Sequence, residues 1–208
     1  MTQNEMQQGI SILFKKLTIA ENNRLIYKQL TELCGIGKQF ECVMKKSNCF
    51  WQLTVSSLCF SIITELAKIF DEQKDAFGIK KLINISSQNG EWFSKWYEEN
   101  GVSHKEFIKL LETKYNGINE KREKLKEIRD AELAHNDRKN LLNIEIIYEG
   151  FTWGDIEDLI ETAYEIMNSI SVGLTGCEYF IQADNYDDVK ILIHNAYKGM
   201  HNVQKLNN

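Results

Sequence analysis

Apolar positions repeat every three or four residues along most of the chain, which is the spacing of one buried helix face. This spacing predicts long helices from about Asn4 to Leu33 and after Thr152. The segment from Cys49 to Asp71 is apolar on most of its circumference, which is typical of a helix at the centre of a bundle. Shorter apolar repeats predict further helices, which are expected over about 77–86, from Ser103, over about 118–135 and after Asp184.

Two short motifs mark where helices begin. Ser103-His-Lys-Glu106 and Thr152-Trp-Gly-Asp155 are capping-box patterns, in which the two outer side chains each bind a free amide at a helix start. The helix after the second motif is expected to run as far as Phe180. A polar break over 135–140 is followed by partial alternation over 141–148, which favours a short extended connector.

The absence of proline agrees with this helical pattern. None of the 208 residues is proline, the residue that breaks helix interiors and punctuates loops. The pattern shows no repeat period and no linker-like segment, and the length suits one domain with a proper core. We therefore expect an all-α helix bundle that occupies residues 1–208 as a single domain.

The composition also indicates where the protein acts. The N-terminus is polar and lacks the layout of a signal peptide, and no apolar stretch approaches the ~20 residues that span a bilayer. Five irregularly spaced cysteines form neither a disulfide framework nor a zinc pattern. We expect a cytoplasmic protein with no membrane contact, no metal and no other cofactor.

Ionisable residues with complementary chemistry gather at the end of the charged helix over 118–135. Arg129 and His135 differ by about 120° around the helix, so both can face one groove. Histidine can move a proton near neutral pH, and arginine can stabilise a phosphate or an oxyanion. Asp130 can hold Arg129 or orient the imidazole. A helix-end ion pair, with histidine near the negative end of the helix dipole, explains the same residues without any chemistry.

The charge distribution partly favours a nucleic-acid ligand at this place. The chain has a net charge of −5, which discourages a broad nucleic-acid surface. From Lys114 to Lys139, eight basic residues face six acidic ones, so this segment is +2 and the remainder −7. A solvated helix face with ion pairs between residues four apart explains the same charges equally well.

The string Arg129-Asp-Ala-Glu-Leu-Ala-His-Asn-Asp137 resembles the motif of the HEPN superfamily, in which an arginine and a polar residue precede a histidine. The extension after the histidine and the upstream helix from Trp51 to Asp71 are similar to the AbiU-type, abortive-infection branch. The similarity covers roughly residues 50–180. It implies an up-and-down bundle of four to five core helices, with additional short helices and flanking terminal helices.

The resemblance also implies an activity. Many such proteins are metal-independent endoribonucleases of toxin or anti-phage systems, in which the ribose 2′-hydroxyl attacks the adjacent phosphate and leaves a cyclic phosphate. On this reading His135 handles the proton, Arg129 stabilises the phosphate and Asp130 fixes their geometry. RNA then is the substrate and DNA is excluded, because the reaction needs the 2′-hydroxyl. The residues expected to contact the substrate are Arg122, Lys126, Asn136, Asp137 and Arg138.

The same resemblance implies partners. HEPN bundles form homodimers that bring two copies of the motif together, and toxin members are held by an antitoxin protein. A different class of function stays open, because relatives of this fold also include non-catalytic modules that bind a partner protein or RNA.

Overall fold

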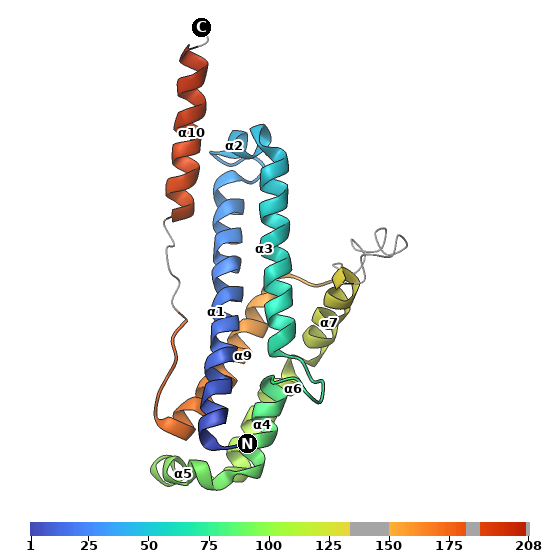
Figure 1. Ribbon diagram of the computed structural model, residues 1–208, viewed down its shortest axis with the longest axis vertical. Coiled ribbons are helices and arrows are strands. Elements are labelled where there is room, and N and C mark those ends of the chain that lie inside the picture. Colours follow the sequence, from blue (N-terminus) through green and yellow to red (C-terminus); the bar gives the residue numbers. More distant parts are fainter. Residues whose placement is uncertain (134–149, 182–187, 207–208) are drawn as a thin grey trace. The chain divides into compact units, whose positions relative to one another are not determined.

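The computed structural model describes residues 1–133, 150–181 and 188–206, except for the side chains of residues 132, 133 and 201–206. Within these ranges the chain is all-α, with nine α-helices, one 3-10 helix and no strand, as the sequence predicted (Figure 1). Two short helices, α2 (Glu41–Lys46) and α5 (Ser94–Asn100), were not predicted from the sequence. The expected connector over 141–148 and the cap at Asp184 lie outside the described residues.

The described part of the chain forms two compact units. The first unit comprises Met1–Thr18 and Ile63–Ile181, and the second comprises Ile19–Ile62 and Gln182–Asn208. Two long helices contribute residues to both units, namely α1 (Gln3–Cys34) and α3 (Asn48–Ile69). The single-domain organisation of residues 1–208 stays a prediction.

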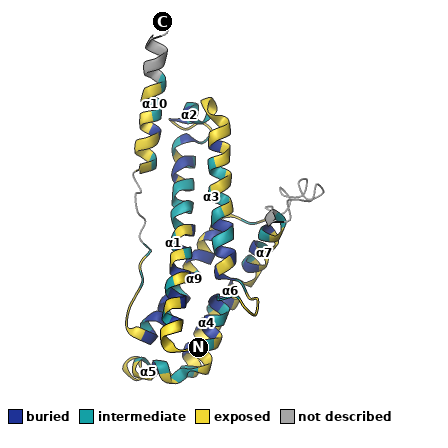
Figure 2. Ribbon diagram, viewed as in Figure 1, coloured by how far each residue is buried: buried dark blue, intermediate teal, exposed yellow. Residues whose placement is uncertain are grey.

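The core of the first unit lies where α4 (Ile79–Gln88), α6 (His104–Gly117) and α9 (Trp153–Thr175) pack on one another. The start of α1 closes this core, since the Phe14 ring stacks on Tyr179 with centroids 4.4 Å apart. The 3-10 helix Gly90–Phe93 and α5 (Ser94–Asn100) add an aromatic cluster at one end, where Phe93 is fully buried. Buried positions follow one another along α9 in Figure 2.

Both predicted capping boxes are present and set the starts of α6 and α9. The Ser103 side chain accepts from the Glu106 amide and Thr152 accepts from the Asp155 amide, and each partner carboxylate accepts a bond in return. The expected continuation of α9 to Phe180 was wrong. The helix ends at Thr175, because Gly176 takes a left-handed conformation with φ of 70°.

The second unit surrounds a separate apolar cluster. Phe40 precedes the short helix α2 (Glu41–Lys46), and its ring lies edge-on to Tyr197 of α10 (Asp188–Leu206) at 5.2 Å. Trp51 of α3 and Ile193 of α10 are buried in the same cluster. The second part of α1 is joined to α3 by a hydrogen bond of 2.8 Å from Asn23 Nδ2 to Ser61 Oγ.

The first half of α3 departs from the prediction of a fully central helix. Phe50 is 59% exposed and Leu53 65%, and this half of the helix carries much of the yellow in Figure 2; Phe60, just beyond it, is 43% exposed. The expectation that no segment reaches the length of a membrane span was also wrong. By length and composition alone the 22-residue α3 is long and apolar enough to cross a membrane, a test that core helices of other proteins also pass.

Candidate functional site

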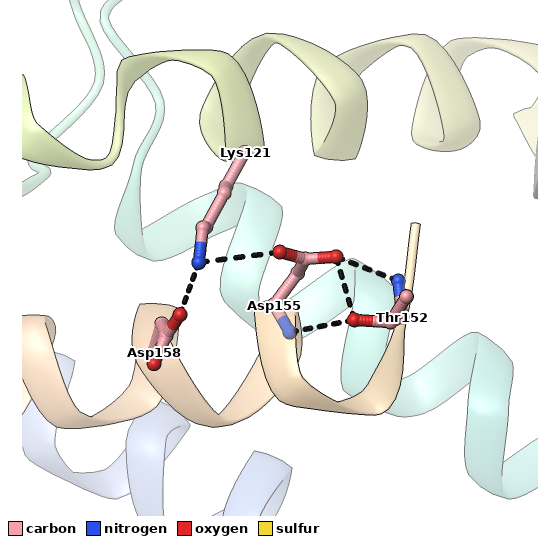
Figure 3. Close-up of polar contacts among 4 residues, drawn as sticks. All are labelled: Lys121, Thr152, Asp155 and Asp158. Atoms are coloured by element: carbon pink, nitrogen blue, oxygen red, sulfur yellow. Dashed lines mark hydrogen bonds and ion pairs between the residues drawn. The ribbon is translucent and has the colours of Figure 1, made fainter. Parts of the chain in front are cut away.

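The helix that carries the motif, α7 (Asn119–Leu133), is fixed at its start to the capping box of α9. Lys121 forms ion pairs with Asp155 (3.2 Å between Nζ and Oδ1) and with Asp158, as Figure 3 shows. The Asp155 carboxylate also accepts from the Thr152 amide at 2.7 Å. This backbone bond is the main reason that the pKa of Asp155 is lowered, while the bond to Asp158 raises the pKa of Lys121. A single lysine thus connects α7 to the first turn of α9.

At the next position of α7, Arg122 is buried and bonded to three residues. Its Nη1 donates to Glu72 Oε1 at 2.5 Å and to the Tyr115 hydroxyl at 2.7 Å, and its Nη2 donates to Asn119 Oδ1 at 2.7 Å. The guanidinium carbon lies 3.8 Å from the centre of the Tyr115 ring, a cation–π contact. We call these four residues, Glu72, Tyr115, Asn119 and Arg122, the arginine clamp.

The clamp changes the ionisation of its members. The hydrogen bond from Tyr115, supported by Arg122, holds the pKa of the Glu72 carboxyl below its usual value. Burial raises the pKa of Tyr115, so that its hydroxyl stays a donor at any physiological pH. The clamp therefore connects α7 to α6 and to the segment after α3, and these bonds hold α7 in position against both.

Arg129 lies two turns beyond Arg122 on the same face of α7. Its Nε and Nη2 both donate to Asp130 Oδ1, at 2.8 and 2.6 Å. The Arg129 side chain is 20% exposed and that of Asp130 is 54% exposed. Asp130 therefore restricts the rotation of Arg129, which is one of the two roles that the sequence left open for it, and the guanidinium still reaches the surface.

The other members of the predicted motif lie outside the described residues. These are His135, Asn136, Asp137 and Arg138. The roles given to them from the sequence stay predictions, as do the substrate contacts given to Arg122 and Lys126.

A pocket of about 250 Å³ lies beside Arg129 in the first unit. One wall is the face of α7, and the other is the end of α3 with the segment that follows it. The α7 wall consists of Arg122, Glu123, Leu125, Lys126 and Arg129. The facing wall consists of Ala67, Phe70, Asp71, Glu72 and Gln73. Arg122, Lys126 and Arg129 are four and three residues apart, which places them in one row along the helix.

Most cations of the basic segment are already paired within the described part of the chain. Lys114 binds Glu165 at 2.5 Å, and Lys124 binds Glu127 at 3.6 Å. Lys126 is exposed and makes no ion pair with any described residue. The solvated, ion-paired helix face thus accounts for several of these charges, whereas Lys126 and part of Arg129 are available to a ligand.

No pattern in the sequence indicated that Asp71, Glu72, Gln73 or Tyr115 belong to this site. Glu72 and Arg122 are 50 residues apart, and no local pattern connects them. The one signal in the sequence was the position of Arg122 on the apolar side of its helix, between Ile118 and Leu125, where a buried arginine needs a carboxylate partner.

The family model named AbiU2, of the HEPN type, matches residues 22–193. The chain belongs to the AbiU2 family of HEPN domains. The match includes α3, the pocket and the whole of the Arg129 to His135 motif, and it confirms the resemblance seen in the sequence. The protein is accordingly an abortive-infection-related HEPN domain. Comparisons with curated proteins and with solved structures gave no match.

Proposed function

We propose that this HEPN domain is a metal-independent endoribonuclease that acts in abortive infection. The observation that carries the proposal is the position of Arg129, held by Asp130 at the edge of a pocket on the helix that leads to His135. A guanidinium that is fixed and still reaches the surface can bind a phosphate without losing much conformational entropy.

The reaction is a transfer of the phosphoryl group within the substrate. The ribose 2′-oxygen forms a bond to phosphorus, and the bond from phosphorus to the 5′-oxygen of the next nucleotide breaks. The proton leaves the 2′-hydroxyl and is delivered to the 5′-oxygen, and His135 moves it. Arg129 neutralises the charge that grows on the phosphate oxygens. The products are a 2′,3′-cyclic phosphate and a free 5′-hydroxyl.

A homodimer is part of this proposal, and the exposed side of α3 supports it. Phe50, Leu53 and Phe60 lie on one side of the helix, and no charged residue occurs from Asn48 to Thr64. An uncharged stripe is complementary to an identical stripe, and homodimer interfaces are the more apolar ones. The three side chains expose on the order of 300 Å² per copy. Stable interfaces bury about 600–1,000 Å² per partner, so the neighbouring serines and Gln52 must join the contact.

A second function is favoured by the bonds of Arg129. Two of its nitrogens are occupied by a residue of the same helix, which is what a structural ion pair at a helix end also predicts. A non-catalytic HEPN module that binds RNA or a partner protein needs no more than this arrangement.

Cleavage of RNA in the presence of EDTA tests the first function. Purified protein is incubated with mixed cellular RNA, beside His135→Ala and Arg129→Gln variants of equal helix content. We expect cleavage that survives chelation, leaves cyclic-phosphate ends and is lost in both variants. Intact RNA after incubation with folded, dimeric protein would favour the binding module. Equal cleavage by the variants would place the activity elsewhere or in a contaminant.

Sedimentation equilibrium tests the dimer. Leu53→Glu puts a charge into the stripe, and Leu110→Glu puts the same charge on an exposed leucine of α6 that is 50% accessible. We expect a dimer for the wild type and for Leu110→Glu, and a monomer for Leu53→Glu. A monomeric wild type at about 100 µM, where an interface of µM affinity is nearly saturated, would overturn the dimer. Binding of the wild type to lipid vesicles, lost in Leu53→Glu, would assign the stripe to a membrane.

A further inference from the structure

The pocket beside Arg129 has the wrong charge for a simple phosphate site. The lining combines the three cations of Arg122, Lys126 and Arg129 with three carboxylates, those of Asp71, Glu72 and Glu123, so its formal charge is zero. A bare anion would be repelled by the carboxylates as strongly as it is attracted by the cations. An uncharged ligand with both donors and acceptors fits such a lining.

The size and the apolar part of the pocket restrict the ligand further. Its volume of about 250 Å³ is below the ~300–1,000 Å³ typical of pockets for drug-sized ligands, so it holds about one flat ring system. Ala67, Phe70 and Leu125 form apolar surface in the same lining. A flat polar ring on an apolar wall is how proteins commonly hold an unstacked base of single-stranded RNA.

Several polar groups in the lining have no bond within the described part of the chain. Arg122 is 8% exposed, and its buried Nε is without a partner there. Lys126 and Glu123 make no ion pair with a described residue. Asp71 is held in place because its Oδ1 accepts from the Gln73 amide at 3.0 Å, which leaves Oδ2 as an acceptor of defined position. Asp71 and Lys126 thus offer an acceptor and a donor to which a ligand in the pocket can bond.

We propose that the pocket receives a guanine base, that of the nucleotide next to the phosphate held by Arg129. This inference rests on the proposed ribonuclease function for the position of the phosphate. Guanine carries two neighbouring donors, N1–H and the N2 amino group, and two neighbouring acceptors, O6 and N7. The Asp71 carboxylate accepts from the donor edge, and Lys126 donates to the acceptor edge. Adenine, cytosine and uracil each lack at least one of these two edges.

Binding of short RNAs tests the base pocket apart from cleavage. The His135→Ala protein is titrated into fluorescent RNA hexamers that contain a single guanine, inosine, cytosine or uracil in an oligoadenosine sequence, with plain oligoadenosine as reference. We expect the guanine hexamer to bind about tenfold more tightly than the reference, which is the size of one bidentate base contact. Inosine lacks the N2 amino group and is expected to fall between guanine and the reference.

Two matched pairs of variants assign the preference to named residues. Asp71→Asn keeps the oxygen that caps the turn and replaces an acceptor by a donor, whereas Asp75→Asn makes the same change on an exposed residue outside the pocket. Lys126→Gln removes the cation of the pocket, and Lys124→Gln removes one that is paired with Glu127. We expect the guanine preference to fall below twofold in Asp71→Asn and Lys126→Gln and to persist in the two controls.

Equal binding of all hexamers, no binding of any, or a preference that persists in Asp71→Asn would each overturn the guanine pocket. Failure of the ribonuclease proposal gives a different result, namely selective binding of the guanine hexamer by a protein whose wild type does not cleave RNA. Cleavage without any base preference would in turn keep the ribonuclease and reject the pocket.

Discussion

Replacing the buried arginine of the clamp separates a structural role from a substrate contact. Arg122→Met keeps most of the apolar stem of the side chain and removes the guanidinium. The structure then loses the bonds from Arg122 to Glu72, Tyr115 and Asn119, together with the stacking on the Tyr115 ring. If the clamp sets the position of α7, this variant must lose stability, whether or not RNA is present.

How much unfolding free energy Arg122→Met loses depends on how exposed the partners of Arg122 are. Removing one partner of a fully buried ion pair costs about 3–5 kcal/mol, because the other charge is left in a dry environment. Glu72 is 51% exposed, so water replaces part of what it loses. Tyr115 is 1% exposed but can still donate to Glu72, so its hydroxyl is not left unpaired. Hydrogen bonds to charged groups contribute ~1.5–3 kcal/mol and cation–π contacts ~0.5–2 kcal/mol, so we expect a net loss of about 2–3 kcal/mol.

Urea unfolding followed by circular dichroism measures this loss, with Lys126→Met as the matched control. Lys126 lies on the same face of α7 and is exposed, so its removal should change the unfolding free energy by less than ~0.5 kcal/mol. Amide hydrogen exchange should also become faster along α7 in Arg122→Met and stay unchanged in the control. A loss below ~0.5 kcal/mol, or equal losses in both variants, would refute the reasoning and would return Arg122 to the substrate-binding set.

Three further predictions concern the supports of the site. Gly78→Ala places a Cβ 2.6 Å from the Asp71 carbonyl oxygen, so we expect the free energy of unfolding in urea to fall by ~1–3 kcal/mol. In the control Gly117→Ala, the added Cβ meets no atom within 4 Å, so this variant should be as stable as the wild type or more stable. Glu72→Gln should destabilise the protein by a constant amount above about pH 5.5. Because the folded-state pKa of Glu72 lies below 4.5, the difference from wild type should shrink as the pH falls below that value, and a difference that grows would contradict the clamp. Thr152→Ala removes the cap of α9 and should cost ~1 kcal/mol, with Thr152→Ser restoring most of it; equal stability of all three proteins would show that the cap contributes nothing.

Local signals were sufficient for much of the helical framework. The two capping boxes set the starts of α6 and α9 because the bonds that make them join residues only three apart. The end of α9 was misjudged because apolar residues continue past Thr175, and the left-handed turn at Gly176 outweighed them. The exposed half of α3 was misjudged for a related reason. Apolar character on all sides predicts burial, but it does not say whether the same chain or another molecule covers the helix.

The residues of the site also differ in whether neighbouring sequence could predict them. Arg129 and Asp130 could be paired from the sequence because they are neighbours, and Lys126 could be placed on the same face by counting along the helix. The partners contributed by the segment after α3 depend on which helices pack together. That arrangement is decided by the summed burial of several helices, so no motif of a few residues contains it.

On the proposed function, the arginine clamp also explains how a segment with little net positive charge can bind RNA selectively. A row of three free cations on α7 would repel one another and attract any polyanion without selection. Pairing Arg122 with Glu72 leaves Lys126 and Arg129 as the charges that face a ligand, with Asp71 opposite them. On the proposed function, we therefore expect weak affinity for the RNA backbone, with contacts to a base deciding which RNA binds.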